Sequence, residues 1–251
     1  MQVIKIGGNQ LDDEEFLRQL GETLARLDSG QVIVHGGGRG TTELCRQLGI
    51  EPRFLDGLRV TDEPTLEATI MGLVGKASLQ VVQALVRAGV PALGLCGADA
   101  GLVTARKLDH PGGDLGRVGV PSRVDWARLK ALLDSGFLPC IAPVCLDETG
   151  RPVNVNADHV AAAVAAELKA DRLVFVTATP GVLVDGSPCA RLSRAECRQL
   201  IRSGVIQDGM VPKVESALQA LASGVASVLI TNLEGLEQLA RGQSVPTELA
   251  A

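Results

Sequence analysis

Short apolar runs alternate along the chain with segments in which apolar side chains recur every three or four residues. The runs predict buried strands at residues 2–6, 31–34, 92–95, 138–142, 172–176 and 226–230. The segments of helical period predict helices at residues 14–27, 42–48, 64–87, 126–135, 157–169, 194–202 and 211–222. Strands that alternate with helices in this way are typical of a sheet with parallel neighbours and helices on its faces, so the pattern predicts an α/β sandwich.

Two stretches break this alternation. Residues 51–62 are extended and rich in turn formers, and residues 97–120 combine many glycines with short apolar pieces, which favours β-hairpins. Gly72 and Gly75 are expected to bend the long helix at 64–87. We find neither a low-complexity linker nor a repeat of about 20 to 50 residues. The sequence therefore predicts one domain with two lobes.

Composition narrows the function classes. The 251 residues are 46% hydrophobic and 21% charged, which excludes collagen-like, disordered and small disulfide-stapled proteins. The net charge is −5, aromatic residues make up 2%, and lysines and arginines form no run, so we expect no nucleic-acid partner. No uncharged apolar stretch approaches the roughly 18 residues that cross a bilayer, and the start MQVIKIGG does not resemble a signal peptide. We expect a cytoplasmic protein without a membrane partner.

Cysteine and histidine do not indicate a metal site. The six cysteines form no CxxC pair, and no histidine lies at metal-ligand spacing from them. We expect buried free thiols and no protein-bound metal. His35 and His159 are interpreted as hydrogen-bonded structural residues.

Two glycine-rich segments each follow a predicted strand and precede a helical segment. They are Lys5-Ile-Gly-Gly-Asn9 and His35-Gly-Gly-Gly-Arg-Gly40. Without Cβ atoms, such loops let backbone N–H groups approach an anion, and the following helix adds unpaired donors, so the pair predicts phosphate contact. Neither loop fits the Walker A or GxGxxG pattern. Purely structural turns are the alternative.

Two lysines stand out among only six in the chain. Lys5 lies at the end of an apolar strand, one residue before the first glycine pair, where its ammonium could reach a phosphate. Lys213 lies near the start of a predicted helix, which the helix dipole disfavours unless an anion is close. For either lysine alone, a surface position with a buried stem is an equally good interpretation.

Further polar residues lie on extended or turn-rich segments. Asn154 and Asn156 share one face of an extended segment, and Asp158 is placed to cap the helix that follows. These residues form either a structural turn or a ligand site whose carboxylate holds lysines in place. Arg59 lies in Gly57-Leu-Arg-Val-Thr-Asp62, where it either grips a carboxylate or is simply exposed.

Six segments in order resemble the motif series of the amino acid kinase superfamily. They are KIGGN, VHGGG, GLRVTD, NVNADHVA, TATPGVL and DGMVPKVESAL. GLRVTD and NVNAD are most similar to the acetylglutamate kinases. The resemblance spans nearly the whole chain and implies a three-layer αβα sandwich with a mainly parallel central sheet. It also implies a lobe of about residues 1–170 for acetylglutamate binding and dimerisation, and one of about residues 171–251 for ATP binding.

The resemblance implies an activity and a role for each matching residue. Kinases of this family transfer the γ-phosphoryl of MgATP to the side-chain carboxylate of N-acetyl-L-glutamate in arginine biosynthesis. By resemblance, Lys5 and Lys213 stabilise the transferring phosphoryl and Asp158 orients them. Substrate contacts are implied for Gly36, Gly37, Arg59, Asn154 and Asn156. Nucleotide contacts are implied for Gly7, Gly8, Ala178, Thr179, Pro180, Gly181, Val182, Leu183, Val205, Ile206, Gln207 and Met210.

The chain departs from the family pattern at three places. Ala178 stands where the family usually has aspartate, so a carboxylate is missing beside the expected ATP site. Gly75-Lys-Ala-Ser-Leu79 replaces Gly-x-x-Asn-Lys, and Pro246-Thr247 replaces Gly-Thr. Members inhibited by arginine carry a helical extension before the first strand. The resemblance therefore implies an arginine-insensitive homodimer.

Two alternatives remain open at this point. A sister kinase would act on an aminoadipate derivative, aspartate or glutamate. A catalytically weak relative would bind an amino acid or nucleotide as a regulatory partner, an alternative motivated by Ala178. Retention of Lys5, Lys213 and Asp158 favours a working kinase.

Overall fold

The computed structural model describes residues 1–27, 30–245 and 247–250. Its centre is an eight-stranded sheet in which all hydrogen-bonded neighbours are parallel except β15 and β16. In spatial order the strands are β14 (Arg191–Ser193), β16 (Glu248–Ala250), β15 (Ser227–Thr231), β11 (Arg172–Val176), β1 (Gln2–Ile6), β2 (Gln31–His35), β8 (Leu138–Ala142) and β5 (Ala92–Cys96). The prediction of a mainly parallel sheet is confirmed.

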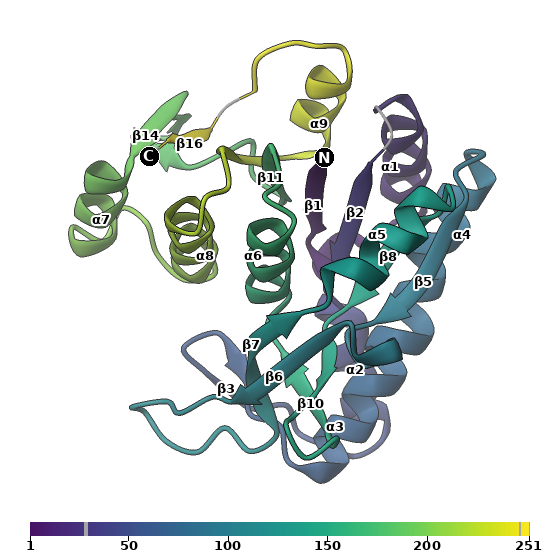
Figure 1. Cartoon of the computed structure of the whole chain (residues 1–251). Coiled ribbons are helices and arrows are strands. Elements are labelled where there is room, and N and C mark those ends of the chain that lie inside the picture. The colour runs from purple at the N-terminus through teal and green to yellow at the C-terminus, as the bar shows by residue number, and fades with distance from the viewer. Residues whose placement is uncertain (28–29, 246, 251) are drawn as a thin grey trace.

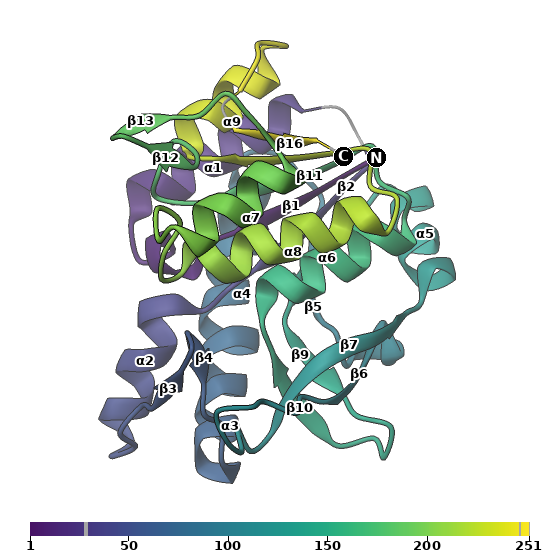
Figure 2. The same ribbon diagram turned by 90° about the vertical axis from the view of Figure 1, so that its left-hand side faces the viewer.

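Helices cover both faces of the sheet, as Figure 1 shows. One face is covered by α5 (Trp126–Asp134), α6 (Ala157–Glu167) and α8 (Met210–Ala222). The other is covered by α1 (Glu14–Arg26), α4 (Ser78–Arg87) and α9 (Leu233–Ala240). Helix α7 (Arg194–Arg202) packs beside α8, on the side that faces the viewer in Figure 2. The arrangement is a three-layer αβα sandwich.

Alternation along each strand divides its side chains between two cores. Val3 packs toward α6 and α8, whereas Ile4 and Ile6 pack toward α1, α4 and α9. All three side chains are fully buried, as expected for a central strand covered on both faces. By the same period of two, Lys5 points to the side of Val3.

A small β-barrel follows the carboxyl end of β8. The short strand β9 (Val144–Leu146) follows β8 directly and joins β6 (Val103–Lys107), β7 (Val118–Val124) and β10 (Pro152–Val155) in a closed four-stranded barrel. The hairpin of β3 (Phe54–Leu55) and β4 (Leu58–Arg59) lies at the same end of the molecule, in the lower part of Figure 2. β6 and β7 pair antiparallel, which confirms a hairpin in this region, although β7 continues beyond the predicted 97–120 to Val124. A small hairpin of β12 (Leu183–Val184) and β13 (Ser187–Pro188) follows β11.

The long helix expected at 64–87 is present and irregular in its middle. It runs from α3 (Glu63–Ile70) through the π-helical turn η2 (Met71–Ala77) into α4. Gly72 and Gly75, where we expected a bend, both lie in the π-helical part. Residues 63–87 are long and apolar enough to cross a membrane by length and composition alone. Side chains such as Leu73 and Val81 are buried in the protein, so packing accounts for this apolar character.

Several element boundaries differ from the predicted ones. The helix expected at 42–48 is α2 (Gly38–Gln47) and begins inside the glycine loop. Helix α6 is capped by Asn156, whose side chain accepts the N–H of Asp158; the expected cap by Asp158 was wrong. α9 and β16 were not predicted. Pro246-Thr247 replaces the Gly-Thr of the family pattern. Pro246 lies outside the described residues, and Thr247 is buried.

Candidate active site

Lys5, Asp158 and Lys213 form a buried charged cluster against the central strand. Lys5 Nζ lies 2.7 Å from Asp158 Oδ1, and Lys213 Nζ lies 3.2 Å from each Asp158 oxygen. Each residue is 7% exposed or less. The three residues come from elements far apart in sequence: Lys5 lies near the end of β1, Asp158 on α6 and Lys213 on α8. The structure therefore brings together all three predicted catalytic residues.

The local geometry of two helices explains how these charges are tolerated. Asp158 lies in the first turn of α6, where the helix dipole favours a carboxylate. Lys213 lies in the first turn of α8, where the same dipole disfavours an ammonium, and Asp158 supplies the compensating charge. Lys213 Nζ also lies over the ring of Phe175, 5.2 Å from the ring centre, in a cation–π contact.

The charges of the cluster shift the pKa values of Asp158 and Lys213. Burial acts to raise the pKa of Asp158, but Lys5 and Lys213 outweigh it and hold that pKa at about 2. Burial and the neighbouring Lys5 ammonium lower the pKa of Lys213 to about 8, against the attraction of Asp158. The cluster carries one more positive than negative charge when both lysines are protonated, and this excess is suited to an added anion.

The two glycine loops pack directly on one another beside this cluster. A Cβ built on Gly8 would lie 2.3 Å from Gly38 N and 2.7 Å from the carbonyl carbons of Gly36 and Gly37. Only glycine allows backbones this close. Gly7 N–H donates to Val176 O, and Gly36 N–H donates to Ile6 O, so these two donors tie the loops to the sheet.

A cleft of about 910 Å³ opens beside the loops. Gly38, Arg59, Asn154 and Asn156 line it, so three predicted substrate residues share one cavity. The charged residues on its wall are Asp12, Arg39, Glu43, Arg46, Arg59 and Lys76. Cations exceed carboxylates in this set, which favours an acidic ligand. Sequence reasoning gave Arg39 and Lys76 no site role, and Gly75-Lys76 was the one local signal that drew attention to this turn.

Arg59 is held in place by residues that sequence reasoning gave no role. Arg59 Nη2 donates to Thr42 Oγ1 at 2.8 Å, and its guanidinium carbon lies 4.8 Å from the centre of the Phe54 ring. The side chain is therefore fixed from two sides before any ligand binds, and its planar fork is suited to a carboxylate.

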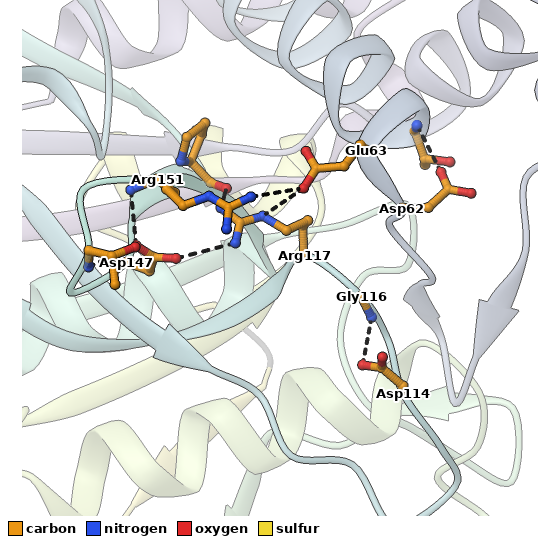
Figure 3. Close-up of polar contacts among 10 residues, drawn as sticks. Asp62, Glu63, Asp114, Gly116, Arg117, Asp147 and Arg151 are labelled. Atoms are coloured by element: carbon orange, nitrogen blue, oxygen red, sulfur yellow. Dashed lines mark hydrogen bonds and ion pairs between the residues drawn. The ribbon is translucent and has the colours of Figure 1, made fainter.

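A set of ion pairs anchors the strands that carry Asn154. Arg117 Nη1 lies 3.3 Å from Asp147 Oδ2, and Arg117 Nη2 donates to Pro152 O at 2.7 Å. Glu63, at the start of α3, contacts both Arg117 and Arg151, as Figure 3 shows. The cluster joins the start of α3 to the barrel.

The residues expected to contact nucleotide lie after β11, the strand next to β1 in the sheet, and around the start of α8. Ala178–Leu183 follow the carboxyl end of β11, where Val176 is in register with Ile6 of β1. Val205, Ile206 and Gln207 precede α8, and Met210 begins it. Ligands of open parallel sheets bind at the carboxyl ends of strands, and these segments meet that condition. Ala178 is exposed, and Thr179 Oγ1 is buried without a hydrogen-bond partner among the described residues.

Comparison with known proteins agrees with this architecture. Residues 1–232 match the amino acid kinase family. A curated acetylglutamate kinase of Roseiflexus sp. (strain RS-1) is 49% identical over 246 residues, covering 98% of this chain and 93% of the relative. Among solved structures, smu.665 from Streptococcus mutans UA159 has a TM-score of 0.84 at 29% identity, covering 100% of this chain and 98% of that one. N-acetylglutamate synthase from Neisseria gonorrhoeae, complexed with coenzyme A and N-acetyl-glutamate, has a TM-score of 0.86 at 27% identity, over 100% and 59% of the two chains.

Proposed function

Because the chain belongs to the amino acid kinase family, with acetylglutamate kinases among its relatives, we propose that it phosphorylates N-acetyl-L-glutamate. The γ-phosphoryl of MgATP is transferred to the side-chain carboxylate, giving ADP and the acyl phosphate N-acetyl-L-glutamyl 5-phosphate for arginine biosynthesis. The observation that carries the proposal is the buried cluster of Lys5, Asp158 and Lys213 beside a cationic cleft.

The chemistry requires positioning and charge neutralisation more than proton transfer. A carboxylate is already a nucleophile, so the site must align two anions and stabilise charge on the phosphoryl oxygens. Lys5 and Lys213 supply two ammonium groups, and Asp158 holds both of them in place. Gly8 and Gly36 let the two loops pack backbone against backbone beside the lysines.

The cleft is suited to the acceptor. We assign Arg59 to the α-carboxylate, because its fork is fixed by Thr42 and Phe54 and lines the cleft. Asn154 and Asn156 line the same wall and would bind neighbouring polar atoms of the N-acetyl amino acid. The Nδ2 of Asn154 and the cap role of Asn156 already restrict both side chains.

The nucleotide would lie against Ala178–Leu183, Val205–Gln207 and Met210, with its phosphates directed toward Gly8. The described residues gather no group of three histidine, cysteine or acidic side chains, and both oxygens of Asp158 are committed to lysines. We therefore treat Mg²⁺ as part of the MgATP substrate, held mainly by phosphate oxygens.

We also propose a cytoplasmic homodimer. The long helix exposes Met71, Leu79 and Val86, each more than half exposed, and the neighbouring β5 is an edge strand of the sheet. Large apolar side chains gathered on one helix beside a sheet edge are suited to contact with a second copy of the chain. Light scattering of the wild type and of Leu79→Glu tests the dimer; a wild-type monomer contradicts it.

The cytoplasmic location is supported by the cysteines, because free thiols at all six are compatible with a reducing compartment.

Trapping the product with hydroxylamine tests the activity. The purified protein is incubated with MgATP and with N-acetyl-L-glutamate, glutamate, aspartate, α-aminoadipate or N-blocked aminoadipate. We expect a hydroxamate from N-acetyl-L-glutamate alone. A signal confined to an aminoadipate compound identifies a sister kinase instead. Silence with every acceptor, from folded protein that still binds ligand, supports a regulatory relative.

A further inference from the structure

Thr61 connects two residues that line the cleft, Arg59 and Asn154. It lies between β4 and α3, is completely buried, and pairs with Gly116 through an isolated parallel bridge. The Thr61 hydroxyl donates to Arg59 O at 2.7 Å, and Asn154 Nδ2 donates to Thr61 Oγ1 at 3.2 Å. One hydroxyl thus contacts the backbone of Arg59 and the side chain of Asn154.

The single proton of this hydroxyl fixes the direction of the second contact. A threonine hydroxyl donates one hydrogen bond and accepts through its lone pairs. Because the Thr61 proton points to Arg59 O, Thr61 Oγ1 can only accept from Asn154. The Asn154 amide must therefore direct Nδ2 to Thr61, and a flipped amide would set two acceptors against each other.

The backbone around this contact leaves little other freedom. Thr61 N–H donates to Leu115 O, Arg117 N–H donates to Thr61 O, and Asn154 N–H donates to Arg117 O. Arg117 is itself held by Glu63 and Asp147, as seen in Figure 3. Asn154 is thus fixed at the backbone by β7 and at the amide by Thr61.

We propose that Thr61 is a positioning residue that sets Asn154 Oδ1 as the hydrogen-bond acceptor of the cleft. Asn154 lines the cleft, and its Oδ1 receives no hydrogen bond from any residue the structure describes. The site then selects an acceptor that keeps a proton on its α-nitrogen, as the secondary amide of an N-acyl amino acid does. This inference rests on the proposed function and assigns Asn154 Oδ1 as the atom that accepts the hydrogen bond of the substrate's amide N–H.

The consequence is selectivity against an isosteric ester. In 2-acetoxyglutarate an oxygen replaces the amide N–H, so its lone pairs would face those of Asn154 Oδ1. A site built around a substrate N–H rejects an analogue that lacks it strongly. Without the Thr61 oxygen, Asn154 can turn its amide over and donate Nδ2 to the ester, so the selectivity falls.

The test compares kcat/KM for N-acetyl-L-glutamate and (S)-2-acetoxyglutarate in the wild type and in Thr61→Val. We expect a wild-type preference for the amide of about 100-fold or more, and a preference at least about tenfold smaller in the variant. Thr61→Ser keeps the hydroxyl and should keep the preference. Thr69→Val is the matched control, because Thr69 is also buried, on α3, and its Oγ1 has no partner among the described residues.

Calorimetric Kd values for both ligands are measured in parallel. An amide preference that is unchanged in Thr61→Val, or absent from the wild type, overturns the inference. Where Thr61→Val does not fold, Thr61→Ala removes the same oxygen and replaces it in the test. The wild type alone still tests whether the site prefers the amide over the ester. If the wild type phosphorylates neither ligand, the proposed function fails, and the ratio of Kd values judges the role of Thr61 separately.

Discussion

Lys5 Nζ and Asp158 Oδ1 lie 2.7 Å apart in the interior, so the first strand of the chain and the helix α6 meet through a buried ion pair. Lys213 approaches the same carboxylate from α8. A buried charge cluster of this kind costs stability unless every member is paired, and it is retained where its charge has a use. We propose that its use here is the stabilisation of a transferring phosphoryl group.

Asp158→Asn tests how strongly the two lysines depend on this carboxylate. The variant leaves two buried ammonium groups without a counter-charge, so we expect unfolding free energy to fall by about 3–5 kcal/mol. Turnover should drop by about 100-fold or more because the lysines are no longer aligned. Urea unfolding and steady-state assays measure both effects. Asp134→Asn, which removes an exposed pair with Lys130, should change stability by less than about 1 kcal/mol; similar behaviour of the two variants contradicts the account.

The lowered pKa of Lys213 gives a direction to the pH dependence. Burial and Lys5 lower this pKa to about 8, so the ammonium is charged below that pH and loses its charge above it. Since the free enzyme needs the charge, kcat/KM should fall as pH rises through about 8, approaching about tenfold per pH unit. Lys213→Arg stays protonated and should remove this decline from whatever activity remains. A wild-type profile that is flat to pH 10 would falsify the assignment.

Gly8→Ala and Gly7→Ala form a matched pair in the first glycine loop. The added Cβ at Gly8 would collide with backbone atoms of Gly36, Gly37 and Gly38, so the loops must separate. At Gly7 the nearest atom, Val176 O, is 3.4 Å away. We expect Gly8→Ala to lose turnover by at least about tenfold, as a small misplacement of reacting groups does, and Gly7→Ala to keep most of it. Equal activity of the two variants would argue against the close packing of the loops.

Arg59→Lys tests the carboxylate fork. The ammonium of lysine cannot reproduce the bidentate geometry or the contact with Thr42 and Phe54. Losing a charge-assisted hydrogen bond of about 1.5–3 kcal/mol raises KM for N-acetyl-L-glutamate by about 10- to 100-fold. Arg53→Lys, at an exposed position on the same segment, should leave KM unchanged. A wild-type KM in Arg59→Lys would move the α-carboxylate elsewhere.

Local patterns predicted most of the framework. Apolar runs located β1 and β11 to the residue, and helical period located α6 and α8 within about two residues. The pairing of strands depends on contacts between distant segments, so the closed barrel of β6, β7, β9 and β10 could not be derived from periodicity. β16 is only three residues long and was missed for that reason.

The candidate site was partly visible in the sequence. A lysine before a glycine pair and an aspartate after two asparagines were singled out, and the fold brings Lys5 and Asp158 together. The supporting residues were not visible, because Thr61 and Phe54 act through contacts with Arg59 and Asn154 that only the tertiary structure creates. Their residue types alone give no signal.

The turnover and ligand binding of Lys213→Ala test the central claim most directly. Lys213 contacts Asp158 and is absent from the cleft lining, so its loss should remove phosphoryl stabilisation and spare the acceptor. We expect kcat to fall by about 100- to 1,000-fold, while the calorimetric Kd for N-acetyl-L-glutamate stays within about twofold. Lys130→Ala, at an exposed position on α5, should match the wild type in both. Unchanged turnover in Lys213→Ala, with the fold intact, would contradict the assignment of the buried cluster to catalysis.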